Sequence, residues 1–175
     1  MDDSDIIINN ILGRKSVRNF TSEKVDRKDL EMIVRAGMSA PSGVNLQPWE
    51  IIVFDDEKTL DFMVDLHEYS KMFRTATAGI LVCANMDRTM EQFDQLWVQD
   101  CSACTQNMLL AIEALKLGGV WLGIYPIEER CQKLIDYYKL PDNIIPFALI
   151  AVGHPSSEVK AMDKWDDKKL HWDKW

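Results

Sequence analysis

One stretch of the chain limits its possible folds more than any other, residues 97–117, WVQDCSACTQNMLLAIEALKL. At helical spacing these residues are apolar or small on nearly every face, with only a few polar interruptions. A helix of this kind is buried on several sides, and another subunit is one candidate for part of that cover. Gly118 and Gly119 are expected to end it.

Apolar segments before and after this helix predict alternating helices and strands. Ser4 can cap a first helix that Gly13 ends, and Asp26 can cap a second. The other predicted elements are strands at 49–54, 79–84, 120–125 and 146–153, and helices at 57–69 and 127–138. Because the strands are continuous apolar runs, we expect a sheet covered on both faces.

The remaining residues, 154–175, mix Lys, Asp and Trp without a clear period. We expect this segment to wrap an outer surface as an extended tail. The chain carries no Gly/Ser-rich linker, repeat or low-complexity block, so we expect one domain over residues 1–175.

Composition excludes several partners. The chain has a formal net charge of −8, which disfavours binding to nucleic acid or to anionic lipid surfaces. Its apolar runs are shorter than the roughly 20 residues that span a bilayer. The N-terminus opens with Asp2, Asp3 and Asp5 where a secretory leader would be basic, so a cytoplasmic protein is expected.

Four cysteines form neither a dense disulfide framework nor paired zinc-ligand spacings, and no metal site is expected. Cys101 and Cys104 do form a CxxC, which is a redox or metal motif in some contexts. Here it lies inside the long helix, without a second CxxC or a nearby pair of histidines. We therefore interpret both thiols as small packing residues of a buried helix.

A basic cluster, Arg14, Lys15, Ser16 and Arg18, stands out in an otherwise acidic chain. Arginine offers a planar fork of donors for phosphate, lysine adds charge, and a serine hydroxyl can donate one more hydrogen bond. The alternative is a solvated basic turn with no ligand.

Two further segments could line a pocket. In APSGVNLQPWEIIV, two prolines restrict a loop whose Asn45 and Gln47 amides can pair with a heterocycle, although the same residues could simply link a helix to a strand. In GGVWLGIYP, glycines permit close approach of the backbone to a flat ligand. Together with the basic cluster, these segments predict a pocket for a phosphorylated heterocycle.

Taken in order, RKSVRNF, APSGVNLQPWEIIV, QDCSACTQNMLLAIEALKLGGVWLGIYP and the tail resemble the nitroreductase family of FMN-dependent oxidoreductases, over nearly the whole chain. The resemblance implies an α+β, three-layer fold with a central mixed sheet flanked by helices. It also implies an intertwined homodimer with each FMN at the subunit interface.

By this resemblance, Arg14, Lys15, Ser16 and Arg18 would hold the FMN phosphate, the ribityl chain and the pyrimidine edge of the ring, with Arg18 closest to the ring. Leu122 and Gly123 match the backbone beside the reactive nitrogen of the flavin. A loop would reach the flavin largely from the partner subunit, and its matching residues are Pro41, Ser42, Gly43, Asn45 and Gln47.

In the family a basic residue often faces the flavin ring, and Lys71 is the candidate for it in this chain. Many relatives carry two basic phosphate ligands in the tail, separated by one residue, and this chain has Met162 and Lys164 there. Lys164 would keep its role, whereas the methionine leaves one contact missing. Lys160 is a hypothetical substitute, and weaker FMN retention is one expected consequence.

The resemblance implies that NADH or NADPH gives hydride to FMN and leaves before a small acceptor, such as a nitroaromatic or a quinone, enters the same site. Such a ping-pong cycle requires no catalytic protein nucleophile, and none is proposed. His67, His154 and His171 are scattered along the sequence and are expected to be surface or packing residues. Two alternatives remain open: a flavin carrier or sensor without nicotinamide turnover, and an enzyme that consumes the flavin itself.

Overall fold

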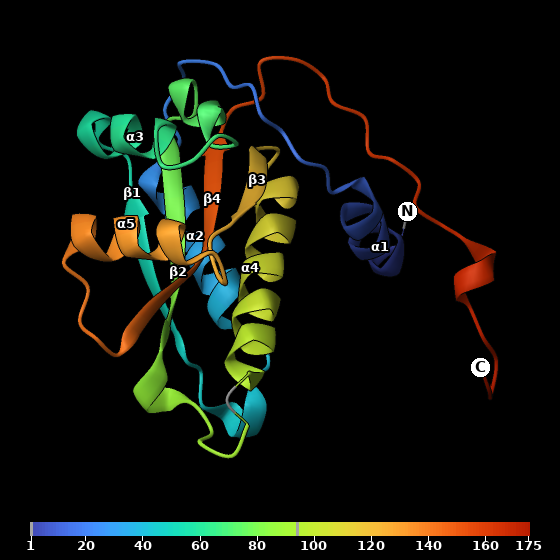
Figure 1. Cartoon of the computed structure of the whole chain (residues 1–175). Coiled ribbons are helices and arrows are strands. Elements are labelled where there is room, and N and C mark those ends of the chain that lie inside the picture. The colour runs from blue at the N-terminus through green and yellow to red at the C-terminus, as the bar shows by residue number, and fades with distance from the viewer. Residues whose placement is uncertain (1, 94) are drawn as a thin grey trace.

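The computed structural model describes residues 2–93 and 95–175. Helices and strands alternate along most of the chain, as the sequence predicts (Figure 1). In order, the elements are α1 (Asp3–Gly13), α2 (Arg27–Met38), β1 (Trp49–Phe54), α3 (Glu57–Val64), β2 (Ala78–Asn85), α4 (Leu96–Ala114), β3 (Gly118–Gly123), α5 (Glu128–Tyr138) and β4 (Ile144–Gly153).

The strands form one sheet in the order β1-β2-β4-β3, and all three pairings are antiparallel. The prediction of a mixed sheet is therefore wrong for the part of the chain that the structure describes. That prediction came from the resemblance, since burial on both faces gives the same apolar pattern whatever the strand direction.

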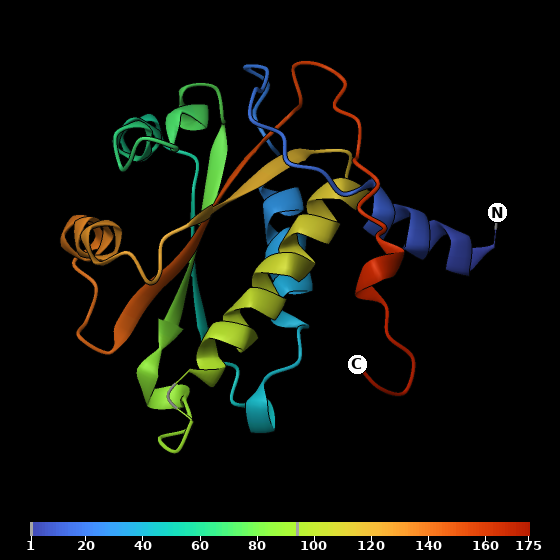
Figure 2. The same cartoon turned by 45° about the vertical axis from the view of Figure 1, so that its right-hand side comes forward.

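Helices cover both faces of this sheet, giving the three expected layers (Figure 2). On one face, Ile80 and Ile150 belong to a core that includes buried residues of α2 and α4. On the other face, Leu81 and Leu149 join a core with residues of α3 and α5. Because neighbouring strand residues point to opposite faces, both must be apolar, which confirms the α+β prediction.

The long helix α4 is buried on several sides, as its sequence predicts. Cys101 and Met108 are fully buried, and α4 contacts α2, α1 and the sheet. Several sides of this helix are therefore covered within one chain, which explains the lack of a polar face.

Three helix ends differ from prediction, and one of them is the end of α4, at Ala114 rather than about Leu117. The cap of α1 is Asp2 rather than Ser4, because the Asp2 carboxylate accepts a hydrogen bond from the Asp5 amide at 2.8 Å while Asp5 reaches back to the Asp2 amide. Helix α3 ends at Val64 instead of about residue 69. There the hydroxyl of Ser70 lies 3.1 Å from the Val64 carbonyl oxygen, and the chain tightens into a turn.

Strand β3 begins at Gly118, two residues earlier than predicted, and Gly118 pairs with Gly153 of β4. A methyl group at Gly118 would lie 2.8 Å from the side chain of Val17, and one at Gly153 would lie 2.9 Å from Phe20. These two glycines therefore make room for the segment after α1 to cross this end of the sheet. The crossing fixes the position of the basic cluster.

Helix α1 and the tail project from the same side of the main body (Figure 2). Helix α1 has no buried residue, and the tail after His154 is extended except for a short turn at Asp167–Lys169. In the described residues, no helix combines the length and apolar character that crossing a membrane requires.

Candidate functional site

The basic cluster lies against the outer edge of β3. The Val17 amide donates to the Gly119 carbonyl at 3.0 Å, which holds the segment in place. Lys15 is tied down, because its ammonium lies 2.7 Å from the carboxylate of Glu113 on α4. In the described residues, the guanidinium groups of Arg14 and Arg18 have neither an ion pair nor a hydrogen bond, so these two cations are available to a ligand.

Arg18 opens onto two adjoining cavities of about 350 and 280 Å³. Both are also lined by Tyr69 and Met72, so they share a wall. The first is completed by Asn19, Glu68 and Lys71, and the second by His67, Val120, Trp121, Leu122, Gly123 and Arg130. The structure thus brings four of the predicted site residues together, namely Arg18, Lys71, Leu122 and Gly123.

Lys71 already has an anionic partner, Asp65, which lines neither cavity. Its ammonium lies 2.9 Å from the Asp65 carboxylate and donates to the Val64 carbonyl at 3.1 Å. The hydrogen bond from Lys71 lowers the pKa of Asp65. Both side chains are exposed, so the pair contributes little stability and can open for another anion.

His67 was expected to be a surface or packing residue, but it lines the smaller cavity. Burial, followed by the positive charge of Arg130, lowers its pKa below the ordinary value, so the ring is neutral at pH 7. The Tyr69 amide donates to Nδ1 at 3.1 Å, which leaves the ring proton on Nε2. That buried Nε2 has no hydrogen-bond partner in the described part of the chain.

The glycines of GGVWLGIYP have different functions. Gly118 makes room for Val17, and a methyl group at Gly119 would lie 3.0 Å from the Ile112 side chain. At Gly123 a methyl group would meet nothing within 4 Å, and the residue does not adopt a positive φ. Neither packing nor backbone conformation within this chain explains the missing side chain. A flat ligand against the Gly123 backbone would explain it.

The predicted ligand loop is held in an unusual conformation. Val44, Asn45 and Gln47 have φ angles of 45°, 60° and 51°, in the left-handed region that side chains disfavour. The Ser42 hydroxyl accepts from the Gln47 amide at 2.9 Å, and the Gln47 side-chain amide donates to Asn45 at 3.0 Å. A strained loop that bonds to itself and exposes Val44 is typical of a binding element.

This loop and the basic cluster lie at opposite ends of α4 (Figure 1). The Gly43 amide donates to Asp100 at 2.9 Å, near the start of the helix, whereas Lys15 pairs with Glu113 near its end. Thirteen residues separate these two anchors, which corresponds to about 20 Å along a helix. One copy of the chain therefore does not bring the loop to its own cluster. Lys164 is exposed in the tail, outside both cavities that Arg18 lines.

Comparison with known proteins settles the family. A sequence profile described as the Nitroreductase family matches residues 11–68 and 61–154. The chain belongs to the nitroreductase family. A relative from Archaeoglobus fulgidus, provisionally named NADH dehydrogenase/NAD(P)H nitroreductase, is 39% identical over 168 residues, covering 94% of this chain and 96% of the relative.

Solved structures of nitroreductase-family proteins support the same fold. One from Bacteroides thetaiotaomicron, with the same provisional name, has 39% identity and a TM-score of 0.91 over 97% of this chain and 98% of that one. Another, described as a nitroreductase in complex with FMN from Desulfovibrio desulfuricans, has 30% identity and a TM-score of 0.83 over 97% of each chain.

Sequence reasoning missed several residues of this nitroreductase-family site. Those that share cavities with the predicted residues are Asn19, His67, Glu68, Tyr69, Met72, Val120 and Arg130. Arg130 is the most informative of them, because it carries charge and donates to the Gly123 carbonyl at 2.7 Å. Its only signal in the sequence is its place in the first turn of the helix that follows GIYP.

The CxxC of this nitroreductase-family chain is deeply buried, as expected for packing residues. Cys101 and Cys104 have no exposed surface, and burial raises the pKa of Cys104 to about 12 and that of Cys101 further. We expect neither thiol to react with iodoacetamide at pH 8 in the native protein, since the thiolate is the nucleophile. Both should react after unfolding in guanidinium. Rapid native labelling at either position, located by peptide mass spectrometry, would contradict this assignment.

Proposed function

We propose that the chain is an FMN-dependent oxidoreductase that passes hydride from NADH or NADPH to a small acceptor such as a nitroaromatic or a quinone. The observation that carries this proposal is a cavity that Arg18 and Gly123 both line. Among the described residues, Arg18 has no ion pair or hydrogen bond, and a methyl group at Gly123 would meet nothing within 4 Å. Support also comes from the names of relatives, which include NAD(P)H nitroreductases and an FMN complex.

The residues present fit FMN. Arg14 and Ser16, beside each other on one short segment, would hold the phosphate, and Lys15 would contribute charge only if it parts from Glu113. Arg18 and Lys71 would face the pyrimidine edge, where positive charge stabilises the reduced form. Leu122 and Gly123 would bring backbone to the reactive nitrogen. When bound, FMN supplies the hydride chemistry, and these residues bind it and orient it.

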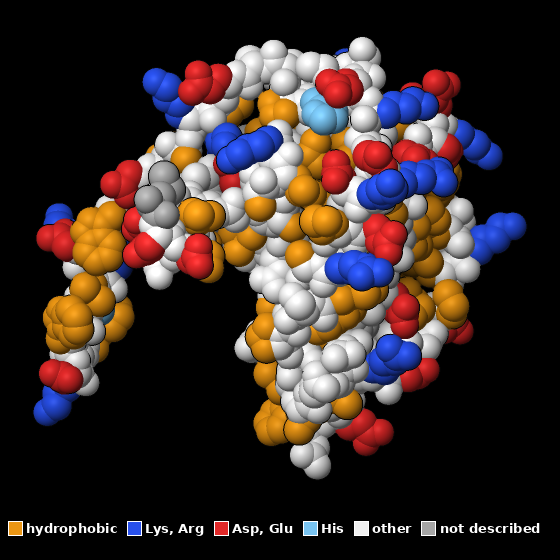
Figure 3. Space-filling model, turned by 180° about the vertical axis from the view of Figure 1, so that it is seen from behind, with side chains coloured by type: hydrophobic (Ala, Val, Ile, Leu, Met, Phe, Trp, Pro, Cys, Tyr) orange, Lys and Arg blue, Asp and Glu red, His pale blue; other side chains and the backbone are white. Residues whose placement is uncertain are grey.

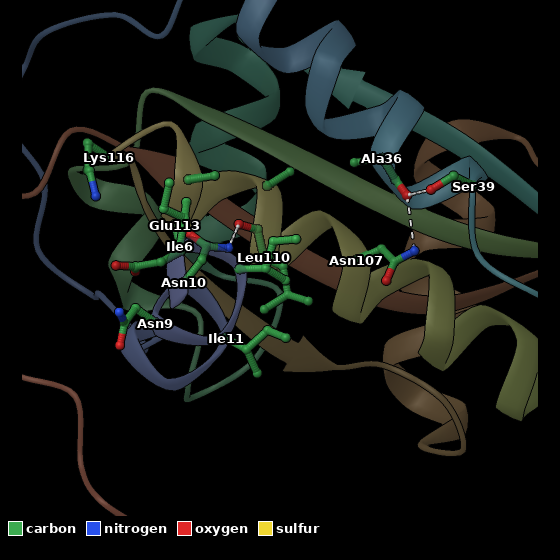
Figure 4. Close-up of a pocket in the computed structure, with 13 residues that line it drawn as sticks. Ile6, Asn9, Asn10, Ile11, Ala36, Ser39, Asn107, Leu110, Glu113 and Lys116 are labelled. Carbon is green, nitrogen blue, oxygen red and sulfur yellow. Dashed lines mark hydrogen bonds between the residues drawn. The ribbon is translucent and has the colours of Figure 1, made fainter. Parts of the chain in front are cut away.

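A second copy of the chain would complete this site. A groove of about 630 Å³ runs between α1 and α4, and Figure 4 shows the Asn10 side chain donating to the Leu110 carbonyl across it. Apolar side chains line most of the groove, and five large apolar residues of α1 are exposed, namely Ile6, Ile7, Ile8, Ile11 and Leu12.

The tail, like α1, exposes large apolar side chains. It exposes Met162, Trp165, Leu170, Trp172 and Trp175, and Figure 3 shows hydrophobic side chains along this projecting arm. Apolar surface on this scale marks an interface. We propose that the partner covers α1 and the tail, and that its 41–47 loop reaches the flavin held by this copy.

We therefore expect an obligate homodimer, about twice the 20.2 kDa mass of one chain, by sedimentation velocity. Replacing Ile7 and Leu12 together by Asp would place two charges on the interface without disturbing the monomer core, because α1 has no buried residue. The double variant should sediment as a monomer and lose most of its FMN. A stable, flavin-loaded monomer of the parent chain would rule out this assembly.

One experiment separates the proposed oxidoreductase from its alternatives. Purified protein loaded with FMN should consume NADH or NADPH steadily when a nitroaromatic or a quinone is added, with ping-pong kinetics. A flavin carrier or sensor would show no such turnover. An enzyme that consumes flavin would destroy FMN in stoichiometric amounts after aerobic reduction, which product analysis detects. We place the reaction in the cytoplasm and assign it to a single domain, residues 1–175.

A further inference from the structure

The free edge of β3 has a direction that can be read from its hydrogen bonds. Gly119 directs its carbonyl away from β4, since it accepts from Val17, whereas Ile124 donates toward β4 at the Phe147 carbonyl. In a strand, alternate residues direct their N–H and C=O groups to the same side. Gly123 therefore directs both groups outward, as Gly119 does, toward the edge where Arg18 and the cavity lie.

Arg130 holds Gly123 in that orientation. Its Nη1 atom donates to the outward Gly123 carbonyl at 2.7 Å, a short charge-assisted hydrogen bond. Gly123 is the last residue of β3, and the next two amides, of Ile124 and Tyr125, both donate to the Phe147 carbonyl. The regular ladder has thus ended, and glycine is the residue with the greatest backbone freedom. The guanidinium supplies the restraint that the ladder no longer supplies.

Helix α5 is itself anchored, so Arg130 extends from a fixed base. Leu134 is fully buried in the core, and the Lys133 ammonium donates to the Leu66 carbonyl at 3.2 Å while pairing with Glu129 at 2.8 Å. In the described residues, Arg130 forms no ion pair. No carboxylate therefore competes with the Gly123 carbonyl for its guanidinium.

We infer that Arg130 is a positioning residue for hydride transfer, which acts by fixing the Gly123 backbone so that its outward N–H meets the reactive edge of the bound flavin. This inference rests on the proposed function, because it needs FMN beside Gly123. A displacement of about 1 Å at a reacting centre can cost about a hundredfold in rate. Arg130 should therefore affect hydride transfer far more than flavin affinity, since the phosphate contacts lie elsewhere.

The test uses the FMN-loaded protein and three variants. Arg130→Met removes both the charge and the donor, Arg130→Lys keeps the charge and one flexible donor, and Arg88→Gln removes an exposed arginine outside both cavities. FMN dissociation constants would be measured by fluorescence titration, and flavin reduction by NADH and by NADPH in anaerobic stopped flow. Thermal melting of the apoproteins would report on the fold.

For Arg130→Met we expect reduction to slow by about ten- to a hundredfold while FMN affinity changes less than about threefold. Arg130→Lys should recover part of the rate, and Arg88→Gln should match the parent. Equal reduction rates in parent and Arg130→Met would overturn the inference. A loss of FMN affinity as large as the loss of reduction rate would also overturn the inference. So would a lowered melting temperature that accounts for the slower reduction. A parent protein that binds no FMN, or that neither nicotinamide reduces, would instead overturn the proposed function and this inference with it.

Discussion

Replacing Gly123 by valine is expected to leave the apoprotein folded, to weaken FMN binding and to slow turnover. The position tolerates a side chain within this chain, because a methyl group there meets nothing within 4 Å and φ is not positive. Valine also suits a strand. If the flavin ring lies against this backbone, the new side chain overlaps it, at a cost of about 1–3 kcal/mol. That range corresponds to roughly five- to over a hundredfold in affinity, and turnover should fall further.

Gly118→Ala provides the contrasting control. Its methyl group would lie 2.8 Å from Val17, so this smaller change should lower the melting temperature. FMN titration and thermal melting of both variants therefore separate a glycine needed for a ligand from a glycine needed for packing. If Gly123→Val bound and reduced FMN as the parent does, the flavin would not lie where the site predicts.

Replacing Arg14 and Arg18 by alanine, one at a time, should change two different properties of the flavin site. If Arg14 grips the phosphate, its loss removes a charge-assisted contact and weakens FMN affinity by about 1.5–3 kcal/mol, or roughly ten- to over a hundredfold. The reduction potential of bound flavin should change little. If Arg18 lies at the pyrimidine edge, its loss should lower that potential, because the reduced form carries more negative charge there.

FMN titration followed by potentiometry of each variant distinguishes the two roles. For a two-electron couple, about 30 mV corresponds to 1.4 kcal/mol, so one lost contact at the ring is measurable. Neither arginine has a partner in the described residues, so neither replacement breaks an existing ion pair of the protein. If both variants matched the parent in FMN affinity and in reduction potential, the basic cluster would be a solvated turn. The sequence also allows that alternative.

The layers of the fold could be predicted because burial leaves a direct record in the sequence. The apolar face pattern of residues 97–117 and the runs at 49–54 and 79–84 predict their helix and strands to within a few residues. Strand direction could not be predicted, since a strand buried on both faces has the same composition in a parallel and in an antiparallel sheet. The end of α3 was also missed, because it depends on a hydroxyl contact from Ser70.

The residues of the candidate site likewise fall into those that the sequence predicts and those that it does not. Arg18 and Gly123 belong to motifs, Lys71 was a candidate by resemblance, and the structure brings the three together. Arg130 and His67 have no motif, because they enter the cavity only through the packing of α5 and of the turn after α3. The distance between the 41–47 loop and the cluster follows from the length of α4 and is invisible in local sequence.

That separation along α4 has a genetic consequence if the proposed assembly is correct. Each flavin site would take its basic cluster from one copy of the chain and its 41–47 loop from the partner copy. Two inactive alleles, one damaged at Arg14 and one damaged in the loop, would then restore one working site whenever their products pair. An allele damaged at both places would instead silence both sites of every mixed dimer, and so would act as a dominant inhibitor in a cell that also carries the intact gene.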